Sequence, residues 1–460
     1  MSDAVHSDVQ RFLDRLSERS NARGAEPTWI AARRQAGAAR FEALGFPHRR
    51  IEAWKYTDVR AIARGDFHLA TDADFSPATA ASLTLPLEAH RLTFVDGIFA
   101  PALSRLDELP NGVQLLPLSR ALVENHEALV ENHEAVGGPL GRLTGVEFSA
   151  FAALNTAFME EGAVLRLASG TIVEKPIILQ FLSRAGEAPV MSHPRILLEA
   201  GSRSQATVIE HHVGEEGAAN FTNLVEEVIL ERGAILTHYK LQEAPLADLH
   251  VASIHVEQAR DSRYTSFNLN LGGGLVRNDL VAELDGQGAE ANFNGLFYGQ
   301  GRQHVDNHTL VNHNAPRTFS NENYKGILDD RAHGVFNGKV VVKRDSQQIE
   351  GYQSNANLLL SDRAEIDTKP ELEIYADDVK CSHGSTTGQL DEEAVFALRC
   401  RGIDEQTARG LLTLAFAGEV LEQVDLDVIA ERVERAVAGK LPERFNLTGL
   451  VEAATALNEE

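Results

Sequence analysis

The chain has 460 residues, of which 43% are hydrophobic and 24% are charged, and its formal net charge is −24. The length exceeds one ordinary compact domain, and the composition excludes the disordered, collagen-like and disulfide-rich classes. The negative charge argues against a nucleic-acid partner or an anionic membrane surface, because such binding relies on Lys and Arg facing phosphates. No export signal or membrane-spanning apolar run is visible, and two cysteines give no disulfide framework, so we expect a cytoplasmic protein.

The first part of the chain, to about residue 70, is predicted to be largely helical. Apolar residues recur at helical spacing from Val9 to Leu16, and the Ala- and Arg-rich segment 29–44 continues the pattern up to Gly45. The following segment, 50–58, places Trp54 and Tyr56 among charged residues. We interpret it as a connection that packs its two aromatic rings on the core.

The next elements are a hairpin and two short helices. Asp96-Gly97 stands between apolar runs, which is a strong hairpin signal. A tandem heptapeptide, ALVENHE, occupies 121–134 and would place His126 and His133 on one helix face. Two histidines need further ligands to bind a metal, so a solvated helix face extended by a local duplication is the favoured interpretation. A further helix is predicted over 151–158.

For more than two hundred residues after this helix the pattern is that of β-structure. Short apolar runs alternate with turns rich in Gly, Asn and Asp, and phrases such as Glu199-Ala-Gly-Ser-Arg and Glu231-Arg-Gly-Ala indicate strands that end in glycine turns. A β-sandwich or a wound β-solenoid would both give this pattern. The solenoid is favoured, because the stretch is long for one sandwich and no linker divides it.

Histidines in this β-region are weak candidates for a metal site. On the predicted strand 303–313, His304 and His308 would lie about 13 Å apart, too far to share one ion, with Asp306 beside them on the polar face. His211 and His212 would point to opposite faces of a strand. Gly334 to Lys339 resembles a phosphate loop, but it is too short between its glycines and lacks the Ser or Thr that would bind magnesium.

The end of the chain, 391–460, is predicted to be helical again. Apolar residues recur every four positions from Ala408 to Val424, and Leu411, Leu414 and Leu421 make much of the opposite side apolar as well. Such a helix must be covered by other helices or by a partner protein.

The stretch 371–389 joins the β-region to these helices and carries Cys381-Ser382-His383. We expect it to be extended, so that the thiol of Cys381 and the imidazole of His383 share a face about 6 to 7 Å apart, with Asp377 further along it. Both groups are good ligands for iron or zinc, but two ligands leave the site incomplete unless a partner supplies the rest. The alternative is a buried free cysteine next to a histidine that caps the strand-to-helix junction.

Several motifs together resemble a known family. Tyr375-Ala-Asp-Asp-Val-Lys-Cys-Ser-His-Gly384, Phe336-Asn-Gly-Lys-Val-Val-Val-Lys343, Asn355-Ala-Asn-Leu-Leu-Leu360, Trp54-Lys-Tyr-Thr57 and Ala153-Leu-Asn-Thr156 are similar to the SufB/SufD family of the SUF iron–sulfur cluster assembly system. The SufD branch is favoured, because the SufB branch would carry more cysteines and a Glu-His-Glu-Ala phrase where this chain has Ser-His-Gly-Ser.

The resemblance implies a mainly β fold with α-helices, a right-handed parallel β-helix flanked by N- and C-terminal helical domains. We therefore expect a helical domain over 1–90, a β-helix core over 91–388 with a helical segment from about 115 to 160, and a C-terminal helical domain over 389–460. The C-terminal domain would dock an ATPase.

The resemblance also implies a scaffold subunit and not an enzyme, with a SufB-like subunit and a SufC-like ATPase as partners. His383 would lie at the interface with SufB as a metal ligand shared with that subunit, and Cys381 would accompany it. The chain alone would hold no cofactor: iron or an iron–sulfur cluster would be transient in the complex, and ATP would be bound by the partner. Whether the isolated chain forms a homodimer stays open. The rival class is a stand-alone enzyme, such as a polysaccharide lyase or a metal-dependent cupin.

Overall fold

The computed structural model describes residues 3–22, 27–124 and 139–441. Most of the tandem heptapeptide, including His126 and His133, lies outside these ranges, so the interpretation of that repeat stays a prediction. Its first residues end helix α5, Leu118–Glu124.

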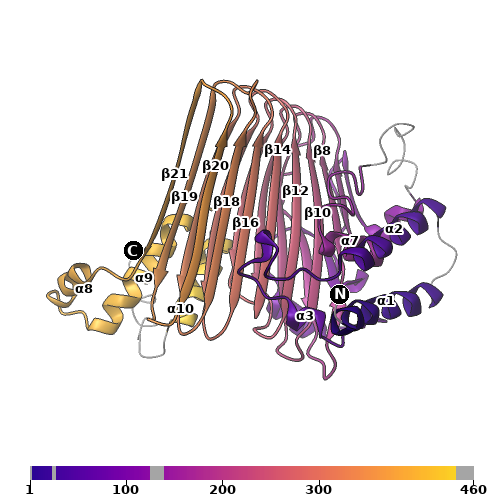
Figure 1. The fold of residues 1–460 in the computed structure, drawn as a ribbon, viewed down its shortest axis with the longest axis horizontal. Helices are drawn as coiled ribbons and strands as arrows, with labels where there is room; N and C mark the ends of the chain where they lie inside the picture. The colour runs from indigo at the N-terminus through magenta and orange to yellow at the C-terminus, as the bar shows by residue number, and fades with distance from the viewer. Residues whose placement is uncertain (1–2, 23–26, 125–138, 442–460) are drawn as a thin grey trace.

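The centre of the molecule is a solenoid in which the chain passes alternately through two sheets (Figure 1). From β10 on, each strand pairs in parallel with the strand two positions earlier in the chain. One sheet contains β8 Arg195–Ala200, β10 Phe221–Leu230, β12 Leu249–Gln258, β14 Leu275–Leu284, β16 His304–His313, β18 His333–Val342 and β20 Glu365–Ile374. The other contains β9 Gln205–Gly214, β11 Ile235–Glu243, β13 Arg263–Asn270, β15 Glu290–Gly299, β17 Phe319–Leu328, β19 Ile349–Leu359 and β21 Val379–Gly388. The predicted parallel β-helix is thus confirmed.

Earlier strands complete the two sheets. They are β1 His68–Leu69, β2 His90–Val95, β3 Ile98–Phe99, β4 Val113–Pro117, β5 Gly162–Leu167, β6 Ile177–Ser183 and β7 Val190–Ser192. The predicted hairpin joins β2 to β3, and Asp96 and Gly97 both have positive φ, as the tight turn requires.

The turns that lead from the first sheet to the second share one backbone feature. Each of six successive turns contains one residue with φ between 57° and 75°: Arg203, Gly233, Asp261, Gly288, Arg317 and Gln348. Stacked turns also bond to each other, as when the Gly233 amide donates to the Arg260 carbonyl at 2.9 Å. The glycine turns expected after Glu199 and Glu231 are therefore corners of the solenoid.

Most of the N-terminal helices cover the outer face of the sheet that contains β8 to β20, at its first coils. They are α1 Asp3–Ala22, α2 Thr28–Leu44, the 3-10 turn Glu52–Trp54, α3 Arg60–Ala63 and α7 Ala150–Phe158. Helix α4 Pro77–Leu83 instead packs its Ala80 against Val95, Leu182 and Val213 of the other sheet, and a second 3-10 turn spans Pro101–Leu103. Phe12, Phe41 and Phe151 pack with Phe221 of β10 and Val251 of β12 in one buried cluster. The helices predicted from Val9 to Leu16, over 29–44 and over 151–158 are confirmed as α1, α2 and α7.

The C-terminal helices cover the outer face of the other sheet, which contains β9 to β21. They are α8 Glu392–Arg399, α9 Glu405–Leu421 and α10 Asp427–Lys440. Val420 of α9 and Ile429 of α10 are fully buried in a cluster with Tyr239, Leu269 and Leu296 of the solenoid. Much of the apolar surface of α9 is therefore covered by α10 and by strands of the same chain.

Candidate functional site at the open end of the solenoid

The last coil, β20 and β21, leaves one end of the solenoid open (Figure 1). Among the described residues, each of these ten-residue strands is paired on one side alone, so each presents a free row of backbone amides and carbonyls. Unlike the strands before it, β21 is mostly exposed along its length. A long free strand edge pairs readily with another chain, and proteins normally protect such edges.

Cys381 and His383 both lie on β21 and face the inside of the coil. Cys381 is in register with Gly351 and His383 with Gln353. The same register columns continue through buried residues of the lumen: Ser320 and Ala291 behind Cys381, and Glu322 and Phe293 behind His383. Because no further coil covers β21, these two side chains stand at the open mouth of the lumen. The predicted shared face is confirmed.

Cys381 is half-buried and its thiol is not activated. A Cβ built on Gly351 would lie 3.3 Å from the Sγ atom, so the small residue at 351 leaves room for the thiol. Burial raises the pKa of Cys381, which the backbone amide of Gly351 partly offsets. Since the thiolate is the nucleophile and metal ligand, Cys381 is a weak ligand in the isolated chain.

His383 is exposed, and a polar network lies behind it in the lumen. Gln353, its neighbour in register, donates from Nε2 to Glu322 Oε1 at 3.2 Å. On the opposite sheet, Thr368 Oγ1 contacts Ser385 Oγ at 3.0 Å, which joins the two strands of the last coil. His383 is thus the accessible imidazole of a polar, half-open site.

The stretch 371–389 is not one extended segment, which corrects the prediction. β20 ends at Ile374 and β21 begins at Val379, so residues 375–378 form the corner between two sheets. Asp377 lies in this corner, is exposed and does not continue the face of Cys381 and His383. The turn at residues 375–378, Tyr-Ala-Asp-Asp, contains no glycine, so no residue in it marks the interruption of the strand.

His304 and Asp306 of β16 contact the N-terminal segment. Thr57 donates to Asp306 and contacts His304 Nε2 at 2.8 Å, while Arg277 donates to Asp306 at 2.5 Å and stacks over Trp54. Burial opposes ionisation of Asp306, but the Arg277 guanidinium holds its pKa well below the usual value. The predicted strand and its polar face are confirmed, and the Trp54 to Thr57 motif is the segment that covers this face.

The other weak candidates also have structural positions. His211 faces outward and contacts Glu243 at 3.0 Å, whereas His212 faces the lumen, so the predicted opposite faces are confirmed. Gly334 and Gly338 lie inside strand β18 and form no loop.

A buried charged cluster in the lumen was missed by the sequence reasoning. It includes Glu210, Glu226, His238 and Lys240, all at most 1% exposed. The available signal was the presence of charged residues inside apolar strand runs. The sequence could not show that residues from three different strands meet, because that depends on the stacking of the coils.

Comparison with known proteins identifies the family. Residues 181–416 match the family described as SUF system FeS cluster assembly, SufBD core domain, and residues 11–179 match the SufBD protein N-terminal region. The chain belongs to the SufB/SufD family. The core match begins in β6 and ends in α9, so it spans the solenoid with its open end.

Relatives in other organisms extend this result. An iron-sulfur cluster assembly SufBD family protein of Synechocystis is 34% identical over 95% of this chain and 97% of its own length. The iron-sulfur cluster assembly protein SufD of Escherichia coli is 32% identical over 86% of this chain and 90% of its own. The resemblance to the SufD branch, expected from the motifs, is thereby confirmed.

No helix in the described part of the chain is long and apolar enough to cross a membrane.

Proposed function

We propose that this chain is a SufD-type, non-enzymatic scaffold subunit in a complex that assembles iron–sulfur clusters. The observation that carries the proposal is the open end of the solenoid, where Cys381 and His383 face an uncovered lumen on a free strand. A thiol and an imidazole are ligands suited to iron, but two ligands do not complete a site. The site therefore requires a second protein that supplies the remaining ligands.

The first proposed partner is a SufB-like subunit at the open end. Free edges of β20 and β21 can pair with strands of another chain, which would bring foreign side chains against His383. Iron and sulfide would then be cargo of the shared interface, held transiently, and this chain alone would hold no resident cofactor. The same free edges would also allow a homodimer in the absence of that partner.

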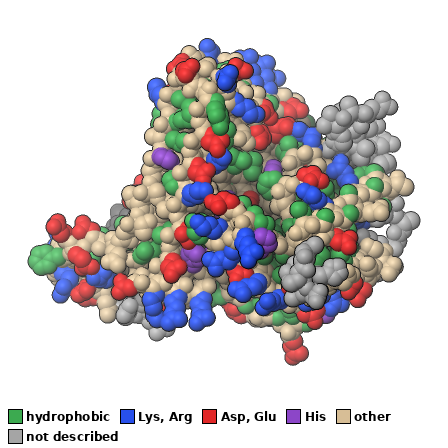
Figure 2. All heavy atoms as spheres, in the orientation of Figure 1, with side chains coloured by type: hydrophobic (Ala, Val, Ile, Leu, Met, Phe, Trp, Pro, Cys, Tyr) green, Lys and Arg blue, Asp and Glu red, His purple; other side chains and the backbone are tan. Residues whose placement is uncertain are grey.

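The second proposed partner is a SufC-like ATPase on the C-terminal helices, through which ATP would act. Helix α8 projects from the solenoid in Figure 1, and hydrophobic side chains are exposed over it in Figure 2. Phe396 on this helix is 65% exposed, whereas the apolar face of α9 is largely buried on the chain's own strands. Docking would therefore use α8 and the outer side of α9.

Replacing His383 tests the proposed site. In the reconstituted complex, His383→Ala should leave the subunits associated but lower cluster formation about tenfold or more, because an accessible metal ligand is lost. Cluster yield is measured by the visible absorption and circular dichroism of bound iron and sulfide. The matched control is Ser382→Ala, which changes the adjacent side chain on the opposite face of β21 and should retain wild-type yield.

Two results would contradict the proposal. An unchanged cluster yield in His383→Ala would exclude His383 from the site. A purified chain that binds neither partner and instead turns over a small-molecule substrate would favour the rival class of stand-alone enzyme.

A further inference from the structure

A second group of side chains with metal-binding chemistry lies inside the solenoid, far back from the open coil. Glu210 projects into the lumen from β9, His238 and Lys240 from β11, and Glu226 from β10 in the opposite sheet. In the described part of the chain, Glu210, Glu226 and His238 form the one trio of such groups whose ligand atoms all lie within 4.8 Å of one another.

The spacing of these atoms is close to that of ligands around one ion. One ligand atom from each residue lies within 4.8 Å of the other two, and His238 Nε2 is 3.7 Å from Glu210 Oε2. This separation between Nε2 and Oε2 is too long for a hydrogen bond. Two ligand atoms bound at 2.0 to 2.2 Å with tetrahedral geometry would lie about 3.4 Å apart. Small side-chain rotations would therefore bring the trio around an ion.

The atoms that face this point have no hydrogen-bond partner among the described residues. They are both carboxylate oxygens of Glu226, Oε2 of Glu210 and Nε2 of His238, and all three residues are at most 1% exposed. Buried polar atoms are almost always satisfied, so these atoms need either a proton shared between the Glu226 and Glu210 carboxyls or a cation between them.

Neighbouring residues set the state of each ligand. Lys240 donates to Glu210 Oε1 and neutralises that carboxylate, but Glu226 forms no ion pair with a Lys or Arg in the described part of the chain. The Tyr264 hydroxyl lies 3.0 Å from His238 Nδ1, and the tautomer that donates this proton to Tyr264 leaves a lone pair on Nε2. Burial lowers the pKa of His238 to about 4, which keeps the imidazole neutral.

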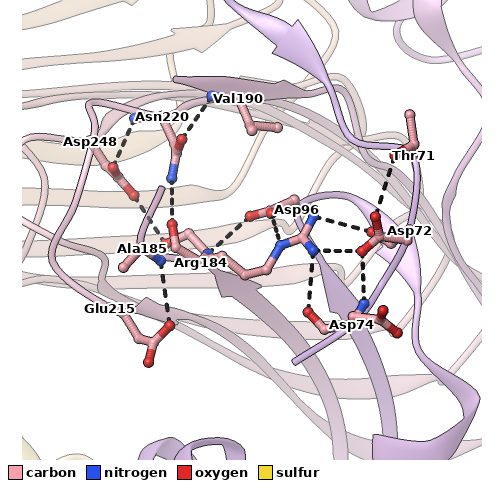
Figure 3. A network of polar contacts seen from close by, with 11 residues as sticks. Thr71, Asp72, Asp74, Asp96, Arg184, Ala185, Val190, Glu215, Asn220 and Asp248 are labelled. Atoms are coloured by element: carbon pink, nitrogen blue, oxygen red, sulfur yellow. Dashed lines mark hydrogen bonds and ion pairs between the residues drawn. The ribbon is translucent and has the colours of Figure 1, made fainter. Parts of the chain in front are cut away.

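A small cavity lies next to a neighbour of the cluster, His212. The cavity has a volume of about 30 Å³ and is lined by His212, His250, Asp96 and Asp248 among others. Figure 3 shows the polar contacts of some lining residues: Arg184 donates to Asp96 and Asp72, and Asp248 accepts from the backbone amide of Asn220. His212 in turn bonds Glu210. A cation entering past these carboxylates would meet His212 next to the trio.

We propose that Glu210, Glu226 and His238 bind a single divalent first-row transition metal ion in the lumen. Two carboxylate oxygens and one imidazole nitrogen suit ions such as Fe²⁺, Zn²⁺ or Co²⁺. The ion would take the place of the proton that the buried Glu226 carboxyl otherwise shares with Glu210. This site is separate from Cys381 and His383. A failed metal-binding test would therefore leave the proposed scaffold function unaffected, and the reverse also holds.

The test uses Co²⁺ as a probe, because its visible absorption reports coordination by protein ligands. The full chain is stripped with a chelator, incubated with Co²⁺ for hours at moderately raised temperature, and passed through gel filtration to remove ions on surface histidines. We expect one retained Co²⁺ per chain in the wild type and at least a tenfold loss of affinity in Glu226→Gln. The Co²⁺-dependent rise in melting temperature should disappear in the same variant.

Glu322→Gln is the matched control, since it makes the same substitution at another fully buried lumen carboxyl. It should retain Co²⁺ like the wild type. The proposal is overturned if the wild type retains no Co²⁺, if Glu226→Gln retains it equally, or if Glu322→Gln loses it to the same extent. If circular dichroism shows that Glu226→Gln is unfolded, His238→Gln carries the same test with the same expected loss.

Discussion

Glu322 shows at the scale of one residue how the lumen changes side-chain chemistry. It lies behind Gln353 and His383 in the same inward-facing column, and it is fully buried. Burial raises its pKa to about 7, and hydrogen bonds from Thr309 and Gln353 offset part of that rise. The carboxyl is therefore mostly protonated in the folded chain at slightly acidic pH.

This shift predicts a pH-dependent stability. Between the ordinary pKa of Glu and about 7, the folded state holds a proton on Glu322 that the unfolded state has lost, so stability falls as pH rises through this window. The slope from this residue is at most about 1.4 kcal/mol per pH unit. Glu322→Gln should flatten the dependence of the denaturation midpoint between pH 5 and 7. An unchanged slope would show that Glu322 is ionised in the fold.

Cys381 and His383 differ in availability, although they share one face of one strand. The thiol is half-buried against Gly351 with a raised pKa, and the imidazole is exposed. Replacement of His383 should therefore lower cluster formation more than replacement of Cys381.

At the scale of elements, one buried ion pair attaches the N-terminal segments to the solenoid. Arg195 of β8 and Glu227 of β10 are both fully buried and 2.9 Å apart. Arg195 also donates to the Thr144 carbonyl at 2.8 Å and to Thr156 Oγ1 at 3.1 Å, while Glu227 accepts backbone amides from residues 141, 143 and 144. The pair thus fastens both the loop before α7 and α7 itself.

Removing one partner should detach these segments. Arg195→Ala leaves Glu227 as an uncompensated buried charge, which typically costs about 3–5 kcal/mol. Because coils of a solenoid contact mainly their neighbours, we expect loss of amide-exchange protection over 139–158 while β14 to β21 stay protected. Arg232→Ala, at an exposed arginine of a nearby turn, is the control and should change neither region. Uniform loss of protection along the solenoid would contradict this local role.

At the scale of the whole molecule, the two proposed interfaces, the open coil and the C-terminal helices, lie on different parts of the chain. The open coil would receive the SufB-like subunit, and α8 with the outer side of α9 would receive the ATPase. Deleting residues 391–460 is a poor test of the second interface, because it would also uncover the solenoid residues Tyr239, Leu269 and Leu296.

Point substitutions can separate the two interfaces. Phe396→Asp should weaken ATPase binding about tenfold or more, since it places a charge on an exposed apolar contact, and should leave binding of the SufB-like subunit unchanged. Affinities are measured by pull-down and calorimetry with each purified partner. Ile172→Asp is the matched control, because Ile172 is 63% exposed on another part of the chain. Equal ATPase affinity in Phe396→Asp and the wild type would exclude α8 from the interface.

The sequence by itself determined the kind of fold and the location of the candidate site. Apolar runs with glycine turns indicated the coils, helical periodicity indicated both terminal helical parts, and the motif from Tyr375 to Gly384 indicated the family. These features are local, because they depend on backbone preferences and on residues within one strand or helix. The shared face of Cys381 and His383 follows from the two-residue repeat of a strand alone.

Tertiary structure decided which residues meet. Most strands are buried on both faces, so their sequences do not alternate and cannot show which side chains line the lumen. Glu210, Glu226 and His238 come together because successive coils stack in register, and the buried face of α9 is apolar because it packs on that stack. The end of the stacking likewise exposes His383 while Glu322, in the same column, is buried.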